Sequence, residues 1–261
     1  MFHISAGKKI IHGSTLLCEW GDDFCCFSAY DRKTKTLQNL QYISFERLTD
    51  GVCNNILQEI KKESEYDKIV FCSCSSEAIL TPATLHNSHN SLPYLFDKKN
   101  VALRDPISEW QLINTYYFPS RLYEKILAAF PLACFLHIYT PSIKIYNGYV
   151  AESQVTVHFT PATFRIIVKK EGQLQLAQIY RYQAPLDVVY YLLKIVQEIG
   201  LSKDDTSIIL SGLIEQDSAL YKELHQYFLN VHFALPGNVS LQNNELPQHF
   251  FTSMFNLAAC E

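Results

Sequence analysis

The sequence contains no stretch rich in lysine and arginine, although 22 of its 261 residues carry these side chains. Because the formal net charge is −4, we expect no broad positive surface of the kind that binds nucleic acid, while a local basic groove is still compatible with this charge. No apolar run approaches the roughly 20 residues that a membrane-spanning helix needs. The first ten residues also lack the continuous apolar core of a signal peptide. We therefore expect neither a membrane span nor secretion.

Charged residues are also scarce, at 18% of the chain against 48% hydrophobic residues, which argues against a disordered protein. A chain of this length forms one large or two modest domains, and either can bury a full core. The 16 tyrosines and 16 phenylalanines suit a core and a partner surface alike. The cysteines lie mainly inside apolar segments, which favours reduced, buried thiols and a cytoplasmic protein. They are residues 18, 25, 26, 53, 72, 74, 134 and 260.

The same order of predicted elements occurs twice, at a constant shift of 139 residues, in residues 15–73 and 154–212. Apolar runs and turn residues predict a strand hairpin, a third strand, a helix and a strand buried on both faces. The first copy is predicted at 15–20, 24–30, 36–45, 50–62 and 69–73, and the second at 155–159, 164–168, 173–182, 186–199 and 206–210. Residue identity between the copies is low, and chance alignment of average-length elements is the alternative. The agreement in order, length and spacing favours a duplicated domain.

The remaining segments complete an α/β chain. Between the copies we predict a strand at 77–81, a short helix at 82–89, a loop-rich stretch at 91–105, a strand at 110–117, a helix at 119–130 and a strand at 132–136. Residues 140–149 are ambiguous, and a helix opening at Pro141 would bridge the halves. After the second copy we predict a helix at 217–229, a strand at 231–234 and a last helix from 246 to about 260. We expect the subdomains to be residues 1–136 and 137–261.

Three antiparallel strands, a helix and a parallel strand, present twice, resemble the ribonuclease H-like unit of the actin-like ATPase fold. This superfamily includes actin, Hsp70 chaperones, sugar kinases and the pilus-assembly actin homologues. Residues 250–259 are similar to the Gly-Leu-Ala-Leu helix that closes the pilus homologues, and the whole chain looks like an uncharacterised bacterial family with this fold. The resemblance implies two duplicated ribonuclease H-like subdomains with a cleft between them.

The turns depart from the pattern of active members of that fold, in which each hairpin turn carries an Asp-x-Gly-type loop that holds phosphate. Glycine is needed there because a side chain blocks close approach of the backbone to the anion. The first turn keeps Glu19 and Gly21 but adds two acids, and in the second turn, at residues 158–162, Pro161 removes an N–H donor. The Gly-Gly pair of the adenosine motif remains only as Ser211-Gly212.

Glu19, Gly21, Ser211 and Gly212 are therefore the candidates for contacts to a nucleotide. With two of three phosphate-contacting elements degenerate, the resemblance implies a non-catalytic cytoplasmic binding or scaffold protein with a protein partner, and hydrolysis by the family mechanism is not expected. The alternative is a protein that binds ATP or ADP, with magnesium, in the cleft between the subdomains and hydrolyses it weakly or not at all. A small-molecule kinase or nuclease would need a cluster of carboxylates that the sequence does not supply.

Two pairs of metal-ligating residue types occur without a complete ligand set. Cys72 and Cys74 lie on one face of a predicted strand, but structural zinc needs four ligands, so buried structural thiols are the better interpretation. His86 and His89 lie about one helical turn apart without a third ligand at a motif spacing, so we interpret them as a solvated pair. No metal site is predicted.

Other side chains that could carry chemistry have simpler interpretations. The serines at 73, 75 and 76 lack the glycines of a nucleophile turn, so we interpret them as strand-end and cap residues. Glu19, Asp22 and Asp23 could suggest a nuclease that holds metal ions between acidic side chains. The predicted strand at 69–73 has no matching acid, which favours a solvated hairpin turn. The aromatic runs at 116–118 and 190–191 lack interleaved basic residues and are predicted to pack in the core rather than stack on bases.

Overall fold

The structure is a computed structural model that describes residues 3–6, 13–63, 66–87, 100–145, 153–235, 237–242 and 246–261. Contacts group the chain into two units. Unit 1 comprises Met1–Ile145, Asn238–Asn244 and Met254–Glu261, and unit 2 comprises Tyr146–Gly237 and Glu245–Ser253. This grouping differs from a linear split after residue 136, because two C-terminal segments join the N-terminal unit. The ribonuclease H-like subdomain bounds 1–136 and 137–261 stay a prediction.

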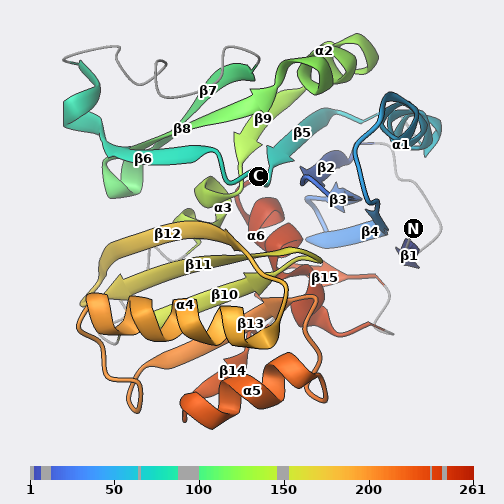
Figure 1. The fold of residues 1–261 in the computed structure, drawn as a ribbon. Helices are drawn as coiled ribbons and strands as arrows, with labels where there is room; N and C mark the ends of the chain where they lie inside the picture. The colour runs from blue at the N-terminus through green and yellow to red at the C-terminus, as the bar shows by residue number, and fades with distance from the viewer. Residues whose placement is uncertain are drawn as a thin grey trace. The chain divides into compact units, whose positions relative to one another are not determined.

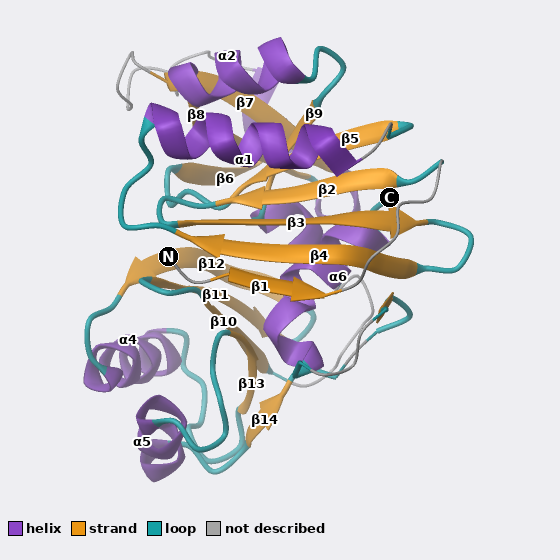
Figure 2. Cartoon of the chain, turned by 90° about the vertical axis from the view of Figure 1, so that its right-hand side faces the viewer, coloured by secondary structure: helices purple, strands orange, loops and turns teal. Residues whose placement is uncertain are grey.

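The larger sheet of unit 1 has the strand order β1-β4-β3-β2-β5-β9, with β15 also paired to β4 (Figures 1 and 2). Its strands are β1 (His3–Ala6), β2 (Thr15–Trp20), β3 (Phe24–Asp31), β4 (Thr36–Ser44), β5 (Lys68–Ser73), β9 (Cys134–His137) and β15 (Ser240–Leu241). Strands β2, β3 and β4 form an antiparallel meander, and β5 lies parallel to β2. Helix α1 (Asp50–Glu63) makes the crossover between β4 and β5. This is the element order predicted for the first copy.

A second, three-stranded sheet in unit 1 has the order β6-β8-β7. It consists of β6 (Ala78–Pro82), β7 (Asn100–Ile107) and β8 (Leu112–Pro119), with 3₁₀ turns at Ala83–Asn87 and Ser108–Trp110. The prediction of a loop-rich stretch at 91–105 is wrong for its last six residues. The apolar side chains of Val101, Leu103 and Ile107 alternate as in a strand, and Pro106 is tolerated because β7 lies at the edge of its sheet.

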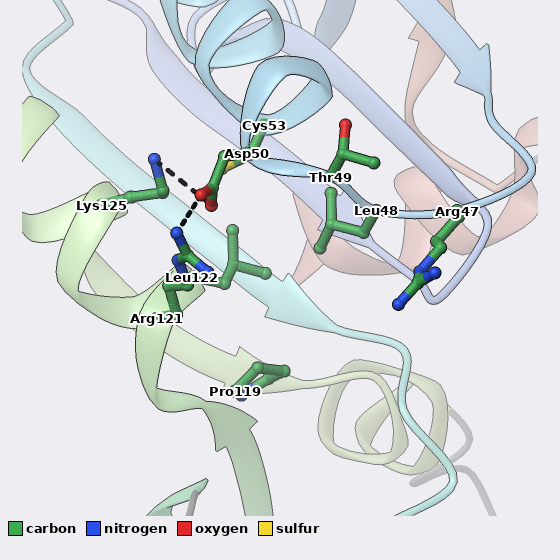
Figure 3. Close-up of a pocket in the computed structure, with 9 residues that line it drawn as sticks. All are labelled: Arg47, Leu48, Thr49, Asp50, Cys53, Pro119, Arg121, Leu122 and Lys125. Carbon is green, nitrogen blue, oxygen red and sulfur yellow. Dashed lines mark hydrogen bonds and ion pairs between the residues drawn. The ribbon is translucent and has the colours of Figure 1, made fainter.

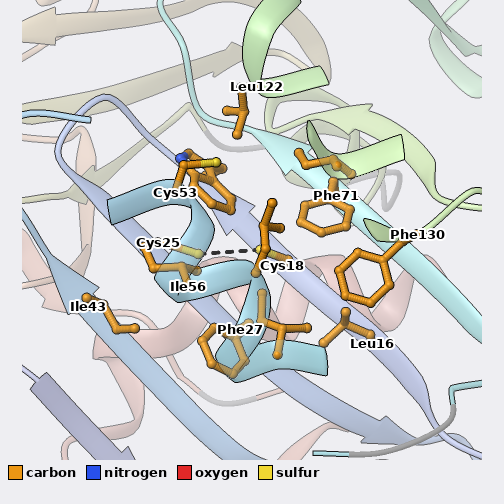
Figure 4. Close-up of a cluster of buried hydrophobic side chains, with 14 of the residues drawn as sticks. Leu16, Cys18, Cys25, Phe27, Ile43, Cys53, Ile56, Phe71, Leu122 and Phe130 are labelled. Atoms are coloured by element: carbon orange, nitrogen blue, oxygen red, sulfur yellow. Dashed lines mark hydrogen bonds between the residues drawn. The ribbon is translucent and has the colours of Figure 1, made fainter. Parts of the chain in front are cut away.

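The core of unit 1 lies between the larger sheet and the helices α1 and α2 (Ser120–Ala129) (Figure 4). Ile56 and Ile60, four residues apart on α1, are both buried in this cluster, which also takes in Phe71 of β5 and Ile126 of α2. Full burial of such a side chain contributes about 1.5–3 kcal/mol. The short helix α3 (Tyr139–Lys144) starts two residues before Pro141. A helix opening at Pro141 was one interpretation of this ambiguous segment.

Unit 2 is a five-stranded sheet with the order β12-β11-β10-β13-β14, and α4 and α5 pack against each other (Figure 1). The elements are β10 (Gln154–Phe159), β11 (Thr163–Lys170), β12 (Gln173–Arg181), α4 (Pro185–Glu198), β13 (Ser207–Gly212), α5 (Ala219–Tyr227) and β14 (Val231–Phe233). Pro185 starts α4, and Gly200, with φ of +69°, follows its end, positions that favour these two residues in helices. The apolar residues of β10, β11 and β13 form a core with the inner faces of both helices.

The two copies share strand register. Strands β2 and β10 start at residues 15 and 154, β3 and β11 at 24 and 163, and β5 and β13 at 68 and 207, so all three pairs keep the predicted shift of 139 residues. In both copies the first strand pairs antiparallel with the second and parallel with the last at equivalent positions. The duplicated element order is confirmed down to the residue pairing of these strands.

The constant shift is wrong for the third strand and the helix. Strand β4 starts at residue 36 and β12 at 173, while α1 starts at 50 and α4 at 185. The first copy has a four-residue turn before its third strand, whereas the second has only Glu171 and Gly172, both with positive φ. The shorter turn accounts for the two residues at the third strand, where strand pairing matches Leu37 with Leu174 and a shift of 139 would match it with Leu176. The loop before the helix is also two residues shorter in the second copy, 182–184 against 45–49, which accounts for the further change at α4.

The C-terminal segment follows the prediction of a last helix. A 3₁₀ turn at Gln248–Phe251 leads into α6 (Thr252–Ala259). The Glu261 carboxylate binds Lys68 Nζ at 2.5 Å and Arg32 at 3.2 Å, both in unit 1. Within the described parts of the chain, no helix combines the length and the apolar character needed to cross a bilayer.

Candidate functional site

The turn between β2 and β3 holds the first two candidate residues, Glu19 and Gly21. The Gly21 N–H donates to the Phe24 carbonyl at 2.9 Å, so this donor closes the hairpin. A Cβ on Gly21 would lie 2.3 Å from the Phe24 ring, which itself stacks on Tyr42 with ring centroids 5.3 Å apart. The packing of the Phe24 ring against this position therefore accounts for glycine at residue 21, without any need for a bound ligand.

Glu19 is buried, with 3% of its surface exposed, and lies between Cys26 of β3 and Cys72 of β5 in the sheet. The interpretation of Glu19, Asp22 and Asp23 as a solvated turn is wrong for Glu19. The alternation of β2 carries this carboxyl onto the sheet face opposite the core residues Cys18 and Trp20. Burial raises the pKa of the Cys26 thiol, and the Glu19 carboxylate raises it further.

The turn between β10 and β11 is hydrogen-bonded to itself. The Thr160 N–H donates to the Thr163 carbonyl at 2.9 Å, and the Thr163 N–H donates to the Thr160 hydroxyl at 3.2 Å. The Tyr182 hydroxyl donates to the Thr160 carbonyl at 3.2 Å. Because Pro161 has no N–H, three of the four backbone nitrogens at 160–163 offer no donor to a phosphate.

Ser211 and Gly212, the other candidates, lie at the end of β13 in unit 2. Gly212 has φ of +80°, and a Cβ there would lie 2.1 Å from the Phe159 carbonyl oxygen and 2.6 Å from the Phe159 nitrogen. The Leu213 N–H donates to the same carbonyl at 2.9 Å. The close approach of β10 therefore accounts for this glycine.

The duplication places a histidine where the first copy has its buried acid. Glu19 pairs with Cys26 and Cys72, and His158, at the same register position of unit 2, pairs with Arg165 and Ser211. His158 Nδ1 lies 3.0 Å from Ser211 Oγ. Burial lowers the pKa of His158 well below its usual value, and Arg165 and His249 lower it further. The second copy thus presents a neutral imidazole and a guanidinium instead of a carboxylate.

The four candidates divide evenly between the units, Glu19 and Gly21 in unit 1 and Ser211 and Gly212 in unit 2. Within each unit the pair lies where adjacent strands end together, since β2 pairs with β5 and β10 with β13 in parallel. Their role in nucleotide contact stays a prediction.

A buried acid that the sequence did not point to lies at the junction of β7, β9 and α3. Asp105 Oδ2 accepts hydrogen bonds of 2.7 Å from the His137 N–H and from the Thr140 hydroxyl. Burial raises the pKa of Asp105, and the two hydrogen bonds oppose that rise. The His137 ring lies 2.9 Å from the Ser75 carbonyl through Nε2 and accepts the Tyr139 N–H through Nδ1. These contacts tie three elements together and leave neither the acid nor the imidazole open to a reactant.

None of the eight cysteines, all of which lie in the described parts of the chain, forms a disulfide, and five are buried. Cys18 Sγ and Cys25 Sγ lie 3.5 Å apart inside the core (Figure 4). Burial raises the pKa of Cys18, and the contact with Cys25 raises it further. Cys134 is exposed, so the expectation of buried thiols is wrong there. Among the described residues no group of three or more His, Cys, Asp or Glu side chains could hold a metal ion, and the side chains of His86 and His89 lie outside the description.

The serine and aromatic interpretations are confirmed in part. Ser73 Oγ accepts the Ser75 N–H at 3.3 Å, as a strand-end cap does. The aromatic side chains at 116–118 are buried in unit 1 as predicted. The prediction is wrong for Tyr190, which is 60% exposed on α4, while its neighbour Tyr191 packs against the unit 2 core.

A pocket of about 350 Å³ opens in unit 1, where the first turn of α1 approaches α2 (Figure 3). Lys125 Nζ lies 3.7 Å from Asp50 Oδ1, and Arg121 forms an ion pair with Oδ2 of the same carboxylate. Thr49 caps α1 by accepting the Val52 N–H at 3.3 Å. The lining consists of Arg47, Leu48, Thr49, Asp50, Cys53, Pro119, Arg121, Leu122 and Lys125. Sequence reasoning missed this pocket, although the four-residue spacing of two cations on a predicted helix was visible.

Comparison with protein families identifies the family of this chain. A family model described as "Protein of unknown function (DUF3822)" matches residues 8–231. The chain belongs to this family. A search of curated proteins by sequence gives no match.

Solved structures similar to the chain share the actin-like ATPase fold. A Bacteroides thetaiotaomicron protein with actin-like ATPase fold and unknown function has a TM-score of 0.72 at 18% identity, covering 97% of this chain and 100% of that one. A chain of the PilM–PilN type IV pilus biogenesis complex has a TM-score of 0.61 at 13% identity, covering 94% and 98%. The ethanolamine utilization protein EutJ from Carboxydothermus hydrogenoformans has a TM-score of 0.53 at 9% identity, covering 97% and 91%. The expected fold is confirmed.

Proposed function

We propose that this protein is a non-catalytic cytoplasmic binding or scaffold protein that has the actin-like ATPase fold and does not turn over ATP. The observation that carries the proposal is the turn at 160–163, whose hydrogen bonds close it on itself. Catalysis of phosphoryl transfer depends on donors and metal ions positioned around the phosphates. Two of the backbone N–H groups of this turn already donate within it, and Pro161 has none to give.

The charge pattern of the second copy supports the same proposal. A magnesium ion beside the phosphates needs oxygen ligands, and carboxylates are the usual ones. At the register position of Glu19, unit 2 has His158, flanked by Arg165. An imidazole kept neutral by burial and a guanidinium both disfavour a hard divalent cation.

The proposed role is to bind a protein partner. Unit 2 leaves Leu186 and Tyr190 exposed on α4, one helical turn apart, at 57% and 60%. Large apolar side chains side by side on a surface are typical of interaction sites, and tyrosine is enriched there. The PilM–PilN complex contains a chain of similar fold together with another protein, which is a property of that complex and a precedent for this proposal.

The test is nucleotide binding and turnover by the pure, full-length chain. We expect no phosphate release above background with magnesium and ATP, and no rise in melting temperature with millimolar ATP or ADP. A ligand at a hundred times its Kd would stabilise the folded state by about 2.7 kcal/mol, a readily detected shift.

Turnover that depends on magnesium and disappears in Glu19→Gln would refute the proposal. The matched control is Glu198→Gln, which removes the same charge at an exposed site in α4. A concentration-dependent rise in melting temperature without turnover would instead support the nucleotide-binding alternative, with Gly21 and Gly212 as its candidates.

A further inference from the structure

We propose that the pocket between α1 and α2 of unit 1 binds a small organic anion, with a phosphate or carboxylate group at the arginines and an apolar group against the leucines. The pocket contains none of the residues expected to contact a nucleotide. It is therefore a separate site, and the proposal does not depend on the function proposed above.

The charges of the lining favour an anion. Three cations, Arg47, Arg121 and Lys125, and a single carboxylate, that of Asp50, line the pocket, so the lining carries an excess of two positive charges. Asp50 is shared by Arg121 and Lys125, and Figure 3 shows Arg47 on the opposite side of the group from Arg121. Arginine presents several N–H donors in a plane, which suits the two oxygens of a carboxylate or phosphate.

The rest of the lining favours an apolar group beside that anion. Leu48, Pro119 and Leu122 contribute hydrocarbon surface, and Leu122 and Cys53 are themselves almost fully buried. Each methylene that a ligand buries there raises its affinity roughly fourfold. An inorganic anion would leave this surface in contact with water.

The volume limits the ligand to a small one. About 350 Å³ lies at the lower end of the range for small-molecule sites and corresponds to roughly ten water molecules. A divalent cation is disfavoured because three positive side chains oppose its approach and only one carboxylate is present to bind it. Charge, shape and size thus agree on one class of ligand.

The experiment titrates the full chain with four probes by calorimetry and by amide chemical shifts. Phenyl phosphate and benzoate carry both a charge and an apolar ring, inorganic phosphate carries only the charge, and phenol only the ring. We expect phenyl phosphate or benzoate to bind at least tenfold more tightly than inorganic phosphate and phenol, with shifts at the amides of Gly51 and Leu122. The tighter of the two aromatic anions identifies the charged group, and tighter binding at low salt is expected for either.

Variants locate the site. Arg47→Gln and Arg121→Gln should each weaken binding about fivefold, the scale of one exposed charge pair. The control is Lys203→Gln, which removes an exposed positive charge in unit 2 and should leave binding unchanged. Circular dichroism checks that each variant folds, and Arg47 is exposed, so its replacement should not disturb the core.

Three results would overturn the proposal. The first is no binding of either aromatic anion at millimolar concentration. The second is equal affinity for inorganic phosphate and phenyl phosphate, which would leave the apolar lining without a role. The third is a loss in Lys203→Gln as large as that in Arg47→Gln, which would show a general effect of net charge.

Discussion

Replacing Gly212 with alanine should destabilise unit 2 by roughly 2–5 kcal/mol, from two separate causes. The backbone at Gly212 has φ of +80°, and a side chain in the left-handed region costs about 1–2 kcal/mol. The new Cβ would also lie 2.1 Å from the carbonyl oxygen of Phe159 and 2.6 Å from its nitrogen, so the end of β10 must move. Overpacking of this kind costs about 1–3 kcal/mol.

Gly200→Ala is the matched control, because it has the backbone cost without the collision. Gly200 has φ of +69°, and the nearest atom to its Cβ would be Lys170 Nζ at 3.6 Å, an ordinary contact. We expect Gly200→Ala to cost about 1–2 kcal/mol. Urea unfolding of both variants, with amide hydrogen exchange of β10 and β13 to locate the change, measures the difference.

Equal losses in the two variants would refute the reasoning, since the collision with Phe159 would then cost nothing. An unchanged stability in Gly212→Ala, together with lost nucleotide binding, would show that a ligand rather than the fold requires this glycine. The expected order, Gly212→Ala more damaging than Gly200→Ala in the absence of any nucleotide, would show a structural requirement.

Two further changes test the electrostatics and the turn of unit 2. Burial lowers the pKa of Lys169 to about 8, whereas its ordinary pKa is 10.5. Between these two pH values the unfolded chain binds more protons than the folded chain, so the free energy of unfolding should rise with pH. The rise should reach up to about 3 kcal/mol relative to Lys169→Met. Denaturant unfolding at pH 7 to 10.5 measures this, and parallel profiles of the two proteins would contradict it. Tyr182→Phe removes the hydrogen bond to the Thr160 carbonyl and should cost about 1 kcal/mol, whereas Tyr227→Phe at a partly exposed site should cost nothing measurable.

The order of elements was predictable because it depends on local patterns. Alternation, apolar runs and turn residues are set by neighbours within a few positions, and they placed the strands of both copies to within two residues. The edge strand β7 was missed because Arg104, Asp105 and Pro106 interrupt its apolar pattern, and only pairing with β8 makes the segment a strand. The shift of α4 against α1 was missed because it comes from two short connections, the turn before the third strand and the loop before the helix, each two residues shorter in the second copy, and changes this small leave little signal at low identity.

The candidate site was predictable only as residue types in turns. The sequence showed that the second turn has no glycine and a proline, but not that Thr160, Thr163 and Tyr182 close it with hydrogen bonds. It also showed Gly21 and Gly212, but not why glycine is needed at these positions. The ring of Phe24 leaves no room for a side chain at Gly21, and the backbone of Phe159 leaves none at Gly212. A glycine kept for packing and a glycine kept for a ligand look the same in a sequence.

By itself the sequence determined the duplicated order of elements, the fold that this order implies and the loss of the usual phosphate-turn residues. Only the tertiary structure decided which side chains are buried and which meet: Glu19 lies inside the sheet, Tyr190 is exposed, and Asp50 pairs with Arg121 across 71 positions of the chain. The physical reason is that periodicity is a property of neighbouring residues, whereas burial and pocket formation depend on segments that folding brings together from far apart.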